Sequence, residues 1–266
     1  MATASTLRRR TLGRKLRLLR ETAGIKVNDA ADHIGLDRTT LQRWERGITA
    51  PNGGNIIALG NLYRATDAEI SRMKTLATRS AERGIWESAE VPAELRALYE
   101  AEGTANLIRS LEMDYIPGLV QTPEYLSAAQ SHLKLSEADA AKVHDVWKKR
   151  QAIVFRHPVP EIRLVFGQSA LLYLNGLPEV KRGQVARLRE VASTPGVEIR
   201  VMTGIHAAMT GAFTIMTADD LLDDPFVFLE SLDGCRYVEE RHVVSEFEWT
   251  FSAVWKSAVP LEEYLT

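Results

Sequence analysis

A short stretch near the N-terminus concentrates arginine, threonine and glutamine side chains within nine consecutive positions. They are Arg38, Thr39, Thr40, Gln42, Arg43 and Arg46. A guanidinium group binds guanine bidentately, and a threonine methyl group packs against the methyl group of thymine. The same side chains also bind phosphate oxygens, which position a protein on the duplex without reading its sequence. These residue types favour contact with double-stranded DNA if one element presents them together.

The surrounding pattern predicts a helix that does so. Asp37 is a good N-cap, and Gly47 stands where the helix should end. Leu41 and Trp44 are three positions apart, so both face the same side, toward a core. The polar side chains are thereby left on the other faces of the helix. Base edges would be reached from its N-terminal residues and phosphates from its flanks.

A second short helix, over residues 28–33, is expected just upstream. Ala30 and Ala31 are small enough to let another helix approach, and Ile34 supplies an apolar anchor. Gly35 follows where the chain must leave the helix, because glycine tolerates the left-handed backbone conformation that is common there. Two short helices with such a turn are typical of a helix-turn-helix, whose second helix enters the major groove. The plainer interpretation is an amphipathic helix pair with a solvated basic face.

Three more helices complete a five-helix domain over residues 11–83. Residues 11–23 carry Leu12, Leu16 and Leu19 at helical spacing, and Gly24 ends this helix. Apolar residues also recur at helical spacing over residues 55–63 and 67–83.

Three segments carry a family resemblance. They are Leu12-Gly13-x-x-Leu16-Arg17-x-Leu19-Arg20-x-x-Ala23-Gly24-Ile25, then Ala30-Ala31-x-x-Ile34-Gly35, then Leu41-x-x-Trp44-Glu45-Arg46-Gly47. Over roughly residues 8 to 80 the chain resembles the lambda-repressor/Cro-like (XRE) helix-turn-helix family. Lys26 departs from the family pattern, which usually has threonine or serine as the N-cap of the first motif helix. The missing cap costs about 1 kcal/mol.

The resemblance implies roles for individual side chains. The side chains expected to face bases are Arg38, Thr39 and Arg43. Those expected to lie near phosphates are Thr40 and Arg46. Arg20 and Glu45 match the arginine–glutamate pair that ties the first helix to the recognition helix in this family. The plainer interpretation of Arg20 and Glu45 is two separate surface charges.

The charge of the chain is unevenly distributed. The net charge of −2 taken alone argues against nucleic acid. Residues 1–50, however, carry eleven Lys/Arg and five Asp/Glu, a balance of +6. Residues 51–266 carry the remaining 22 Lys/Arg and 30 Asp/Glu, a balance of −8. A basic N-terminal module on an acidic body is typical of a DNA reader with a separate regulatory part.

Residues 1–10 are small, polar and basic, and we expect them to form a basic arm. Within this arm, Arg8, Arg9 and Arg10 could lie along phosphates or in a minor groove. The alternative is a solvated run of terminal charge.

Composition places the protein among soluble globular chains. The length of 266 residues permits two domains. The single cysteine, Cys235, rules out an intrachain disulfide and fits a reducing cytoplasm. No apolar run approaches the roughly 18 residues of a membrane span, so we expect a cytoplasmic protein without membrane contact.

The residues after the helical domain change in character. Residues 84–91 read as a linker whose Trp86 is expected to be buried rather than exposed to a partner. Residues 92–266 predict an α+β domain with a mixed sheet, because strand patterns alternate with helical ones and then follow one another closely. The expected strands are residues 105–112, 161–166, 197–202, 213–217, 226–230 and 236–239.

The segment Tyr115-Ile116-Pro117-Gly118-Leu119-Val120-Gln121-Thr122-x-Glu124-Tyr125 carries a second resemblance. It is similar to a signature of an uncharacterised domain that follows the same kind of helix-turn-helix in actinobacterial WhiJ-like regulators. Such regulators are often encoded beside a small acidic protein and are discussed as antitoxin-like. The resemblance therefore implies a possible small acidic protein partner.

The second half shows no catalytic or metal-binding pattern. Its histidines are scattered, and neither HExxH nor CxxC spacing occurs. Ser169 lacks the second glycine of a nucleophile elbow, and the lysine that phospholipase-D-like chemistry needs after His206 is missing. We therefore expect no enzyme, no metal and no cofactor. A deep polar pocket with paired ionisable groups would favour the enzyme alternative.

These patterns together predict a DNA-binding transcriptional regulator. The N-terminal domain would read an operator as a dimer, on half-sites about 34–36 Å apart. The C-terminal domain would mediate dimerisation, partner binding or effector sensing. The alternative is an antitoxin-like interaction factor that binds a small cognate protein and autoregulates its operon.

Overall fold

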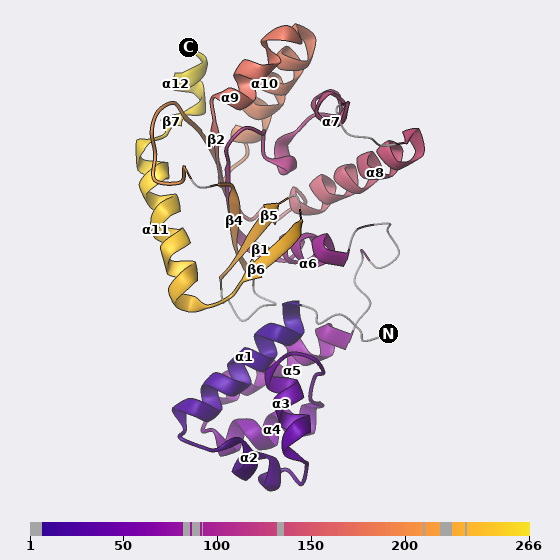
Figure 1. Ribbon diagram of the computed structural model, residues 1–266, viewed down its shortest axis with the longest axis vertical. Coiled ribbons are helices and arrows are strands. Elements are labelled where there is room, and N and C mark those ends of the chain that lie inside the picture. The colour runs from indigo at the N-terminus through magenta and orange to yellow at the C-terminus, as the bar shows by residue number, and fades with distance from the viewer. Residues whose placement is uncertain are drawn as a thin grey trace. The chain divides into compact units, whose positions relative to one another are not determined.

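The computed structural model describes residues 7–81, 86, 91, 93–131, 136–209, 211–218, 225–231 and 233–266. Two compact units divide the chain near residue 84, and each is described by itself (Figure 1). Within the described ranges, no helix has the length and apolar character that crossing a membrane requires.

The N-terminal unit is helical, as predicted. Its helices are α1 (Leu7–Thr22), α2 (Val27–His33), α3 (Arg38–Glu45), α4 (Gly53–Leu62) and α5 (Asp67–Ala81). They enclose one apolar core, in which Leu16, Leu41, Ile56, Leu59 and Met73 are fully buried. Burial of side chains from each of these helices stabilises elements that are too short to persist alone.

The start of α1 differs from the basic arm expected over residues 1–10. Residues 7–10 are helical, and residues 1–6 lie outside the described ranges. Arg8 Nη1 donates to the carbonyl oxygen of Arg79 (3.2 Å), and Arg9 Nη2 donates to that of Ser80 (3.4 Å). These carbonyls belong to the last turn of α5, where helical carbonyls lack intrahelical partners. Leu7 is buried, so the helix extends upstream because it has an apolar anchor there.

Two glycines fix the geometry of the helix-turn-helix. Gly35 follows α2 with φ 66°, and its N–H donates to Asp32 O (3.1 Å). Gly13 lies where α1 meets the end of α3, and an added Cβ would overlap Trp44 O and lie 2.8 Å from Glu45 O. Glycine, which has no Cβ, adopts the positive φ at Gly35 without strain and allows the close approach of α1 to α3 at Gly13.

The C-terminal unit is built on a mixed sheet of order β6-β5-β4-β1-β2-β3-β7. The strands are β1 (Ala105–Glu112), β2 (Glu161–Gly167), β3 (Val197–Met202), β4 (Phe213–Ala218), β5 (Phe226–Ser231), β6 (Gly234–Val238) and β7 (Val259–Pro260). Strand β2 pairs in parallel with β1 and β3, whereas β4–β5, β5–β6 and β3–β7 are antiparallel. The α+β fold with a mixed sheet is thus confirmed.

Helices connect and cover these strands. They are α6 (Ala93–Glu102), α7 (Pro123–Gln130), α8 (Glu137–Val154), α9 (Ser169–Leu172), α10 (Pro178–Ala192), α11 (Arg241–Ser257) and α12 (Leu261–Leu265), with 3₁₀ turns η1 (Gly118–Val120) and η2 (Tyr173–Gly176). Strand β7 and helix α12 were not predicted. Each is short, and the β7 pairing with β3 is tertiary.

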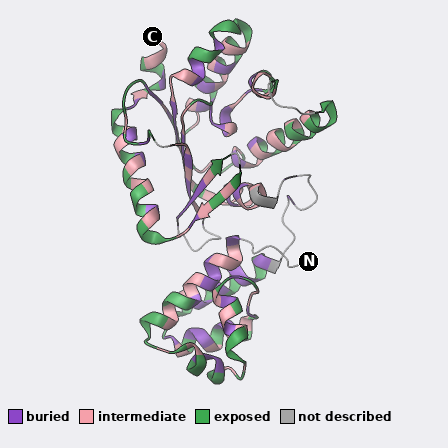
Figure 2. Ribbon diagram, in the orientation of Figure 1, coloured by how far each residue is buried: buried purple, intermediate pink, exposed green. Residues whose placement is uncertain are grey.

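The two faces of the sheet are occupied differently. On one face, Leu111 and Val165 pack with Val244, Phe251 and Val254 of α11 in a dry core. Residues next to Leu111 along β1 point to the opposite face, because side chains alternate along a strand. In Figure 1, α11 and the pair α6 and α8 lie on opposite sides of the strands. Figure 2 shows α11 with exposed residues along its outer side and the central strands largely buried.

Candidate nucleic-acid interface and a cavity in the C-terminal unit

The start of α3 is fixed by Asp37. Its carboxylate accepts hydrogen bonds from Thr40 N (3.1 Å), Thr40 Oγ1 (2.9 Å) and the Thr39 hydroxyl. The Thr39 and Thr40 hydrogen bonds lower the pKa of Asp37 to about 2, because they stabilise the ionised carboxylate. The N-cap predicted from the sequence is therefore present, and the carboxylate stays ionised at neutral pH.

The predicted DNA-contacting residues share the outer side of α3. Leu41 and Trp44 are buried beneath them in the core. Arg38, Thr39, Arg43 and Arg46 are exposed, while Thr40 and Gln42 are half-buried. With its amide oriented to satisfy both groups, Gln42 accepts from Arg38 Nε (3.1 Å). The fold thus gathers five of them on one short helix and the sixth, Arg46, at its C-cap, with four of the six open to solvent.

Arg20 and Glu45 lie together between α1 and α3. Arg20 Nε and Nη2 donate to the two carboxylate oxygens of Glu45 (2.6 and 3.0 Å), and Nη1 donates to Ile25 O (2.9 Å). The side chains are only 11% and 7% exposed, so solvent screens the pair weakly. The hydrogen bond with Glu45 raises the pKa of Arg20. This fork–fork contact orients α3 relative to α1.

Helix α2 begins without a side-chain cap. Lys26 occupies its N-cap position and makes no capping hydrogen bond. The Lys26 side chain is exposed at the N-terminal end of α2. This is the position at which the sequence departs from the family pattern. The positive charge lies at the positive end of the helix dipole, an unfavourable position that a nearby phosphate would relieve.

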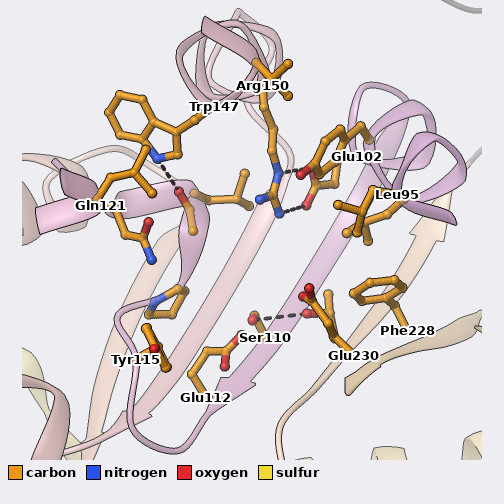
Figure 3. Close-up of a pocket in the computed structure, with 18 of the residues that line it drawn as sticks. Leu95, Glu102, Ser110, Glu112, Tyr115, Gln121, Trp147, Arg150, Phe228 and Glu230 are labelled. Atoms are coloured by element: carbon orange, nitrogen blue, oxygen red, sulfur yellow. Dashed lines mark hydrogen bonds and ion pairs between the residues drawn. The ribbon is translucent and has the colours of Figure 1, made fainter. Parts of the chain in front are cut away.

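A cavity of about 730 Å³ opens on the sheet face opposite α11 (Figure 3). Its walls come from α6, α8, the loop that holds Tyr115 to Gln121, and three neighbouring strands. On β1, Ile108, Ser110 and Glu112 line it at alternate positions, as the pleat of a strand requires. Thr214 of β4 donates to Ser110 Oγ (3.2 Å), and this pair lies on the sheet side of the cavity.

Charged groups surround this space. Arg150 of α8 donates to both carboxylate oxygens of Glu102 on α6 (2.6 and 2.5 Å) and lies over the Tyr99 ring (4.7 Å). Glu112 and Glu230 approach from β1 and β5. Burial, together with the charge of Glu230, raises the pKa of Glu112 to about 7. Glu112 was not predicted as a site residue; the signal for it in the sequence is the alternation of the polar residues Ser110 and Glu112 within a buried strand.

The Tyr115–Tyr125 signature builds one wall of the cavity. The Tyr125 hydroxyl accepts from Ile116 N (3.0 Å), and Gln121 Nε2 donates to Ile116 O (2.7 Å). Trp147 Nε1 of α8 donates to Gly118 O (3.1 Å). Thr122 accepts from Tyr125 N (3.2 Å), which is the predicted N-cap of α7. The signature thus has a structural explanation: it folds a rigid loop against α8.

The cavity meets one part of the condition for the enzyme alternative, since it holds paired ionisable groups, but its lining is more apolar than polar. Its described lining offers carboxylates and hydroxyl groups, with no histidine or cysteine among them. Across the described part of the chain, no group of three or more His, Cys, Asp or Glu side chains could hold a metal ion. His206, which the sequence analysis weighed, does not line the cavity, and burial lowers its pKa.

Trp86 is buried, as expected, and its ring packs on Tyr99 (5.3 Å between centroids). Lys149 lies over the same ring (5.0 Å). The remaining residues of the expected linker, apart from Val91, lie outside the described ranges. This tryptophan therefore belongs to the packing around α6 and α8.

Comparisons with known proteins place both parts of the chain. Residues 95–265 match the family model described as "Domain of unknown function (DUF5753)", and residues 11–73 match the model of a helix-turn-helix domain. No curated protein matches the chain. A solved structure described as "Structure of TrmBL2, an archaeal chromatin protein, shows a novel mode of DNA binding" is 12% identical over 93% of this chain and 99% of that chain. Its TM-score of 0.30 is too low to carry an argument. Since the first model covers more than half of the chain, the protein belongs to the DUF5753 family and carries a helix-turn-helix domain at its N-terminus.

Proposed function

We propose that the protein is a sequence-specific DNA-binding transcriptional regulator of the XRE type. One observation carries this proposal: the helix-turn-helix domain presents Arg38, Thr39, Arg43 and Arg46 to solvent on a single capped helix. Arginines on such a helix bind guanine edges or phosphates according to their position. The protein is further proposed to act in the cytoplasm, as a homodimer on paired half-sites.

Base reading is assigned to Arg38, Thr39 and Arg43, and phosphate contact to Thr40 and Arg46, with Gln42 supporting Arg38. Arg43 is exposed in the last turn of α3, six positions after the N-cap Asp37. Arg46 is the C-cap residue and lies beside it on the exposed flank. The two residues therefore allow base reading and phosphate contact to be tested separately.

The test is binding of full-length protein to operator and to unrelated DNA over a salt series. Arg43→Ala should weaken operator binding by about 1–3 kcal/mol and relax the preference at one base position. Arg46→Ala should weaken binding to all sequences and reduce the magnitude of the salt slope by about one. Arg182→Ala, an exposed arginine of α10, serves as the matched control. An equal loss on every sequence for Arg43→Ala would contradict base reading, and an unchanged slope for Arg46→Ala would contradict the phosphate contact.

The C-terminal unit is proposed to mediate dimerisation, partner binding or effector sensing rather than catalysis.

An antitoxin-like interaction with a small acidic protein is the second candidate. Leu172, Tyr173 and Leu177 favour it, because these large apolar side chains lie within six positions and are 48%, 67% and 45% exposed. Exposed apolar side chains that cluster are typical of protein contacts. Light scattering of the wild type and of Tyr173→Ser would show whether this surface joins two copies; an unchanged mass would leave it to another protein.

A further inference from the structure

The cavity of the C-terminal unit carries an excess of negative charge. Among its described lining residues, the carboxylates are Glu102, Glu112, Asp139 and Glu230, and the cations are Lys142 and Arg150. Arg150 is engaged bidentately by Glu102, and Lys142 lies 3.6 Å from Asp139. The two cations are therefore already matched by two of the four carboxylates. Among the described residues, neither Glu112 nor Glu230 forms an ion pair with a cation.

Glu112 stands out among these groups. It is half-buried and lies in the cavity two positions beyond Ser110, and its carboxylate makes no hydrogen bond or ion pair with another described residue. A half-buried carboxylate without a partner costs free energy. Its neighbour Glu230 adds repulsion, and both effects raise the pKa of Glu112 to about 7. A positive charge placed between the two carboxylates would remove both penalties.

The remaining walls suit an apolar body attached to that charge. Leucine and valine side chains line the cavity together with four aromatic residues, Tyr99, Tyr115, Trp147 and Phe228. The last three are labelled in Figure 3. Aromatic rings also attract cations through their faces. The volume of about 730 Å³ lies within the range of small-molecule sites, which are mostly apolar with a few fixed polar groups.

Other occupants fit this chemistry less well. A divalent metal ion needs several convergent ligands, and the described residues offer no group of three or more such side chains. An acidic peptide would bring negative charge against Glu112 and Glu230. Double-stranded DNA is repelled for the same reason.

We propose that this cavity binds a small organic cation, a protonated amine on an aromatic or apolar body, with the ammonium group at Glu112 and Glu230 and the body against Tyr115, Trp147 and Phe228. The proposal concerns the unit to which the proposed function assigns effector sensing. It does not rest on DNA binding, because it is tested in the absence of DNA.

Binding should strengthen as pH rises from 6 to 8. Glu112 is protonated below about 7 and ionised above it, while a primary amine stays charged throughout this range. The other charged side chains that line the cavity are Glu230 from β5, Glu102 from α6, and Asp139, Lys142 and Arg150 from α8. Of these groups, Glu230 raises the pKa of Glu112 and Arg150 lowers it.

Calorimetry with full-length protein at pH 8 tests the proposal. The probes are tryptamine and phenethylamine, each compared with the alcohol of the same shape, tryptophol and 2-phenylethanol, and spermidine as a cation without a ring. Each aromatic amine should bind about tenfold more tightly than its alcohol, a difference of about 1.4 kcal/mol. Glu112→Gln should abolish that preference, whereas Glu198→Gln, an exposed carboxylate of β3 outside the cavity, should retain it.

Several results would overturn the proposal. They are no binding by any amine, equal binding of amine and alcohol, or full retention of the amine preference in Glu112→Gln. Tight binding of Mg²⁺ or Mn²⁺ with no binding of the amines would overturn it in favour of a metal site. Spermidine binding as tightly as the aromatic amines would contradict the assignment of Tyr115, Trp147 and Phe228. None of these results bears on operator binding, so the proposed function would stand or fall separately.

Discussion

At the scale of single residues, the molecule holds two kinds of buried charge, one compensated by a partner and one not. The Arg20–Glu45 pair is nearly buried but fully hydrogen-bonded, so each charge compensates the other. Glu112 is a half-buried carboxylate without a partner among the described residues, and its burial costs stability when it ionises. The first arrangement ties α1 to α3, and the second is the basis of the proposed cation site.

Breaking the first arrangement on one side should be costly. Glu45→Ala leaves Arg20 nearly buried without its carboxylate, and we expect a loss of about 3 kcal/mol in the free energy of unfolding of the N-terminal unit. Urea unfolding followed by circular dichroism measures this loss. Arg17→Ala, which breaks the exposed Arg17–Glu21 pair and leaves Arg20 with both of its carboxylates, is the control and should change little. A loss for Glu45→Ala no larger than that control would show that the buried pair contributes nothing.

Removing the charge of Glu112 should stabilise the protein in a pH-dependent manner. The folded-state pKa of about 7 exceeds the ordinary value of 4.5, so the wild type has its full stability below about 4.5 and loses part of it as pH rises through 7. Glu112→Gln should therefore match the wild type at pH 4.5 and exceed it at pH 8. After allowance for solvent screening, the gain is about 1–2 kcal/mol. A difference that does not vary with pH in urea titrations would contradict the shifted pKa, and Glu198→Gln controls for loss of charge alone.

At the scale of elements, helices α1 and α3 pack so closely at Gly13 that no side-chain atom fits between them. Gly13 lets α1 approach the carbonyl oxygens at the end of α3. Because those oxygens are backbone atoms, they cannot move without displacing α3 itself. The position of α3 therefore depends on a residue outside the set proposed to contact DNA.

Gly13→Ala should destabilise the N-terminal unit by several kcal/mol, in spite of the better helix propensity of alanine. The matched control is Gly183→Ala in α10, where an added Cβ meets nothing within 4 Å. That control should gain about 0.5–1 kcal/mol. Thermal unfolding of both variants decides the point, and a neutral Gly13→Ala would show that α1 and α3 are not so closely packed.

The elements were largely predictable from the sequence, whereas the cavity was not. Amphipathic spacing predicted the helices of the N-terminal unit, and short strand patterns between turn residues predicted β1 to β6 within a few residues. The extra first turn of α1 depends on carbonyls of α5, far away in sequence. The cavity joins Glu112 with Glu230 and α6 with α8, and no local pattern reveals such a meeting. The ion pair of Arg20 and Glu45 was anticipated only through a family resemblance.

At the scale of the whole molecule, charge is unevenly distributed along the chain. Residues 1–50 carry a balance of +6, and the rest of the chain carries −8. Positive charge attracts the phosphates of DNA, so this distribution supports the proposal that DNA binds at the N-terminal helices. Together, the two proposals give one chain separate sites for an anionic polymer and for a cationic small molecule.

The measurement closest to the central claim is binding of the purified protein to the DNA upstream of its own gene, across a salt series. The wild type is compared with Arg38→Ala/Arg43→Ala, and Arg182→Ala serves as the control. We expect tight, sequence-dependent binding by the wild type and the control, and loss of that specificity in the double variant. Binding that is weak and indifferent to sequence in all three proteins would contradict the assignment of α3 as a recognition helix.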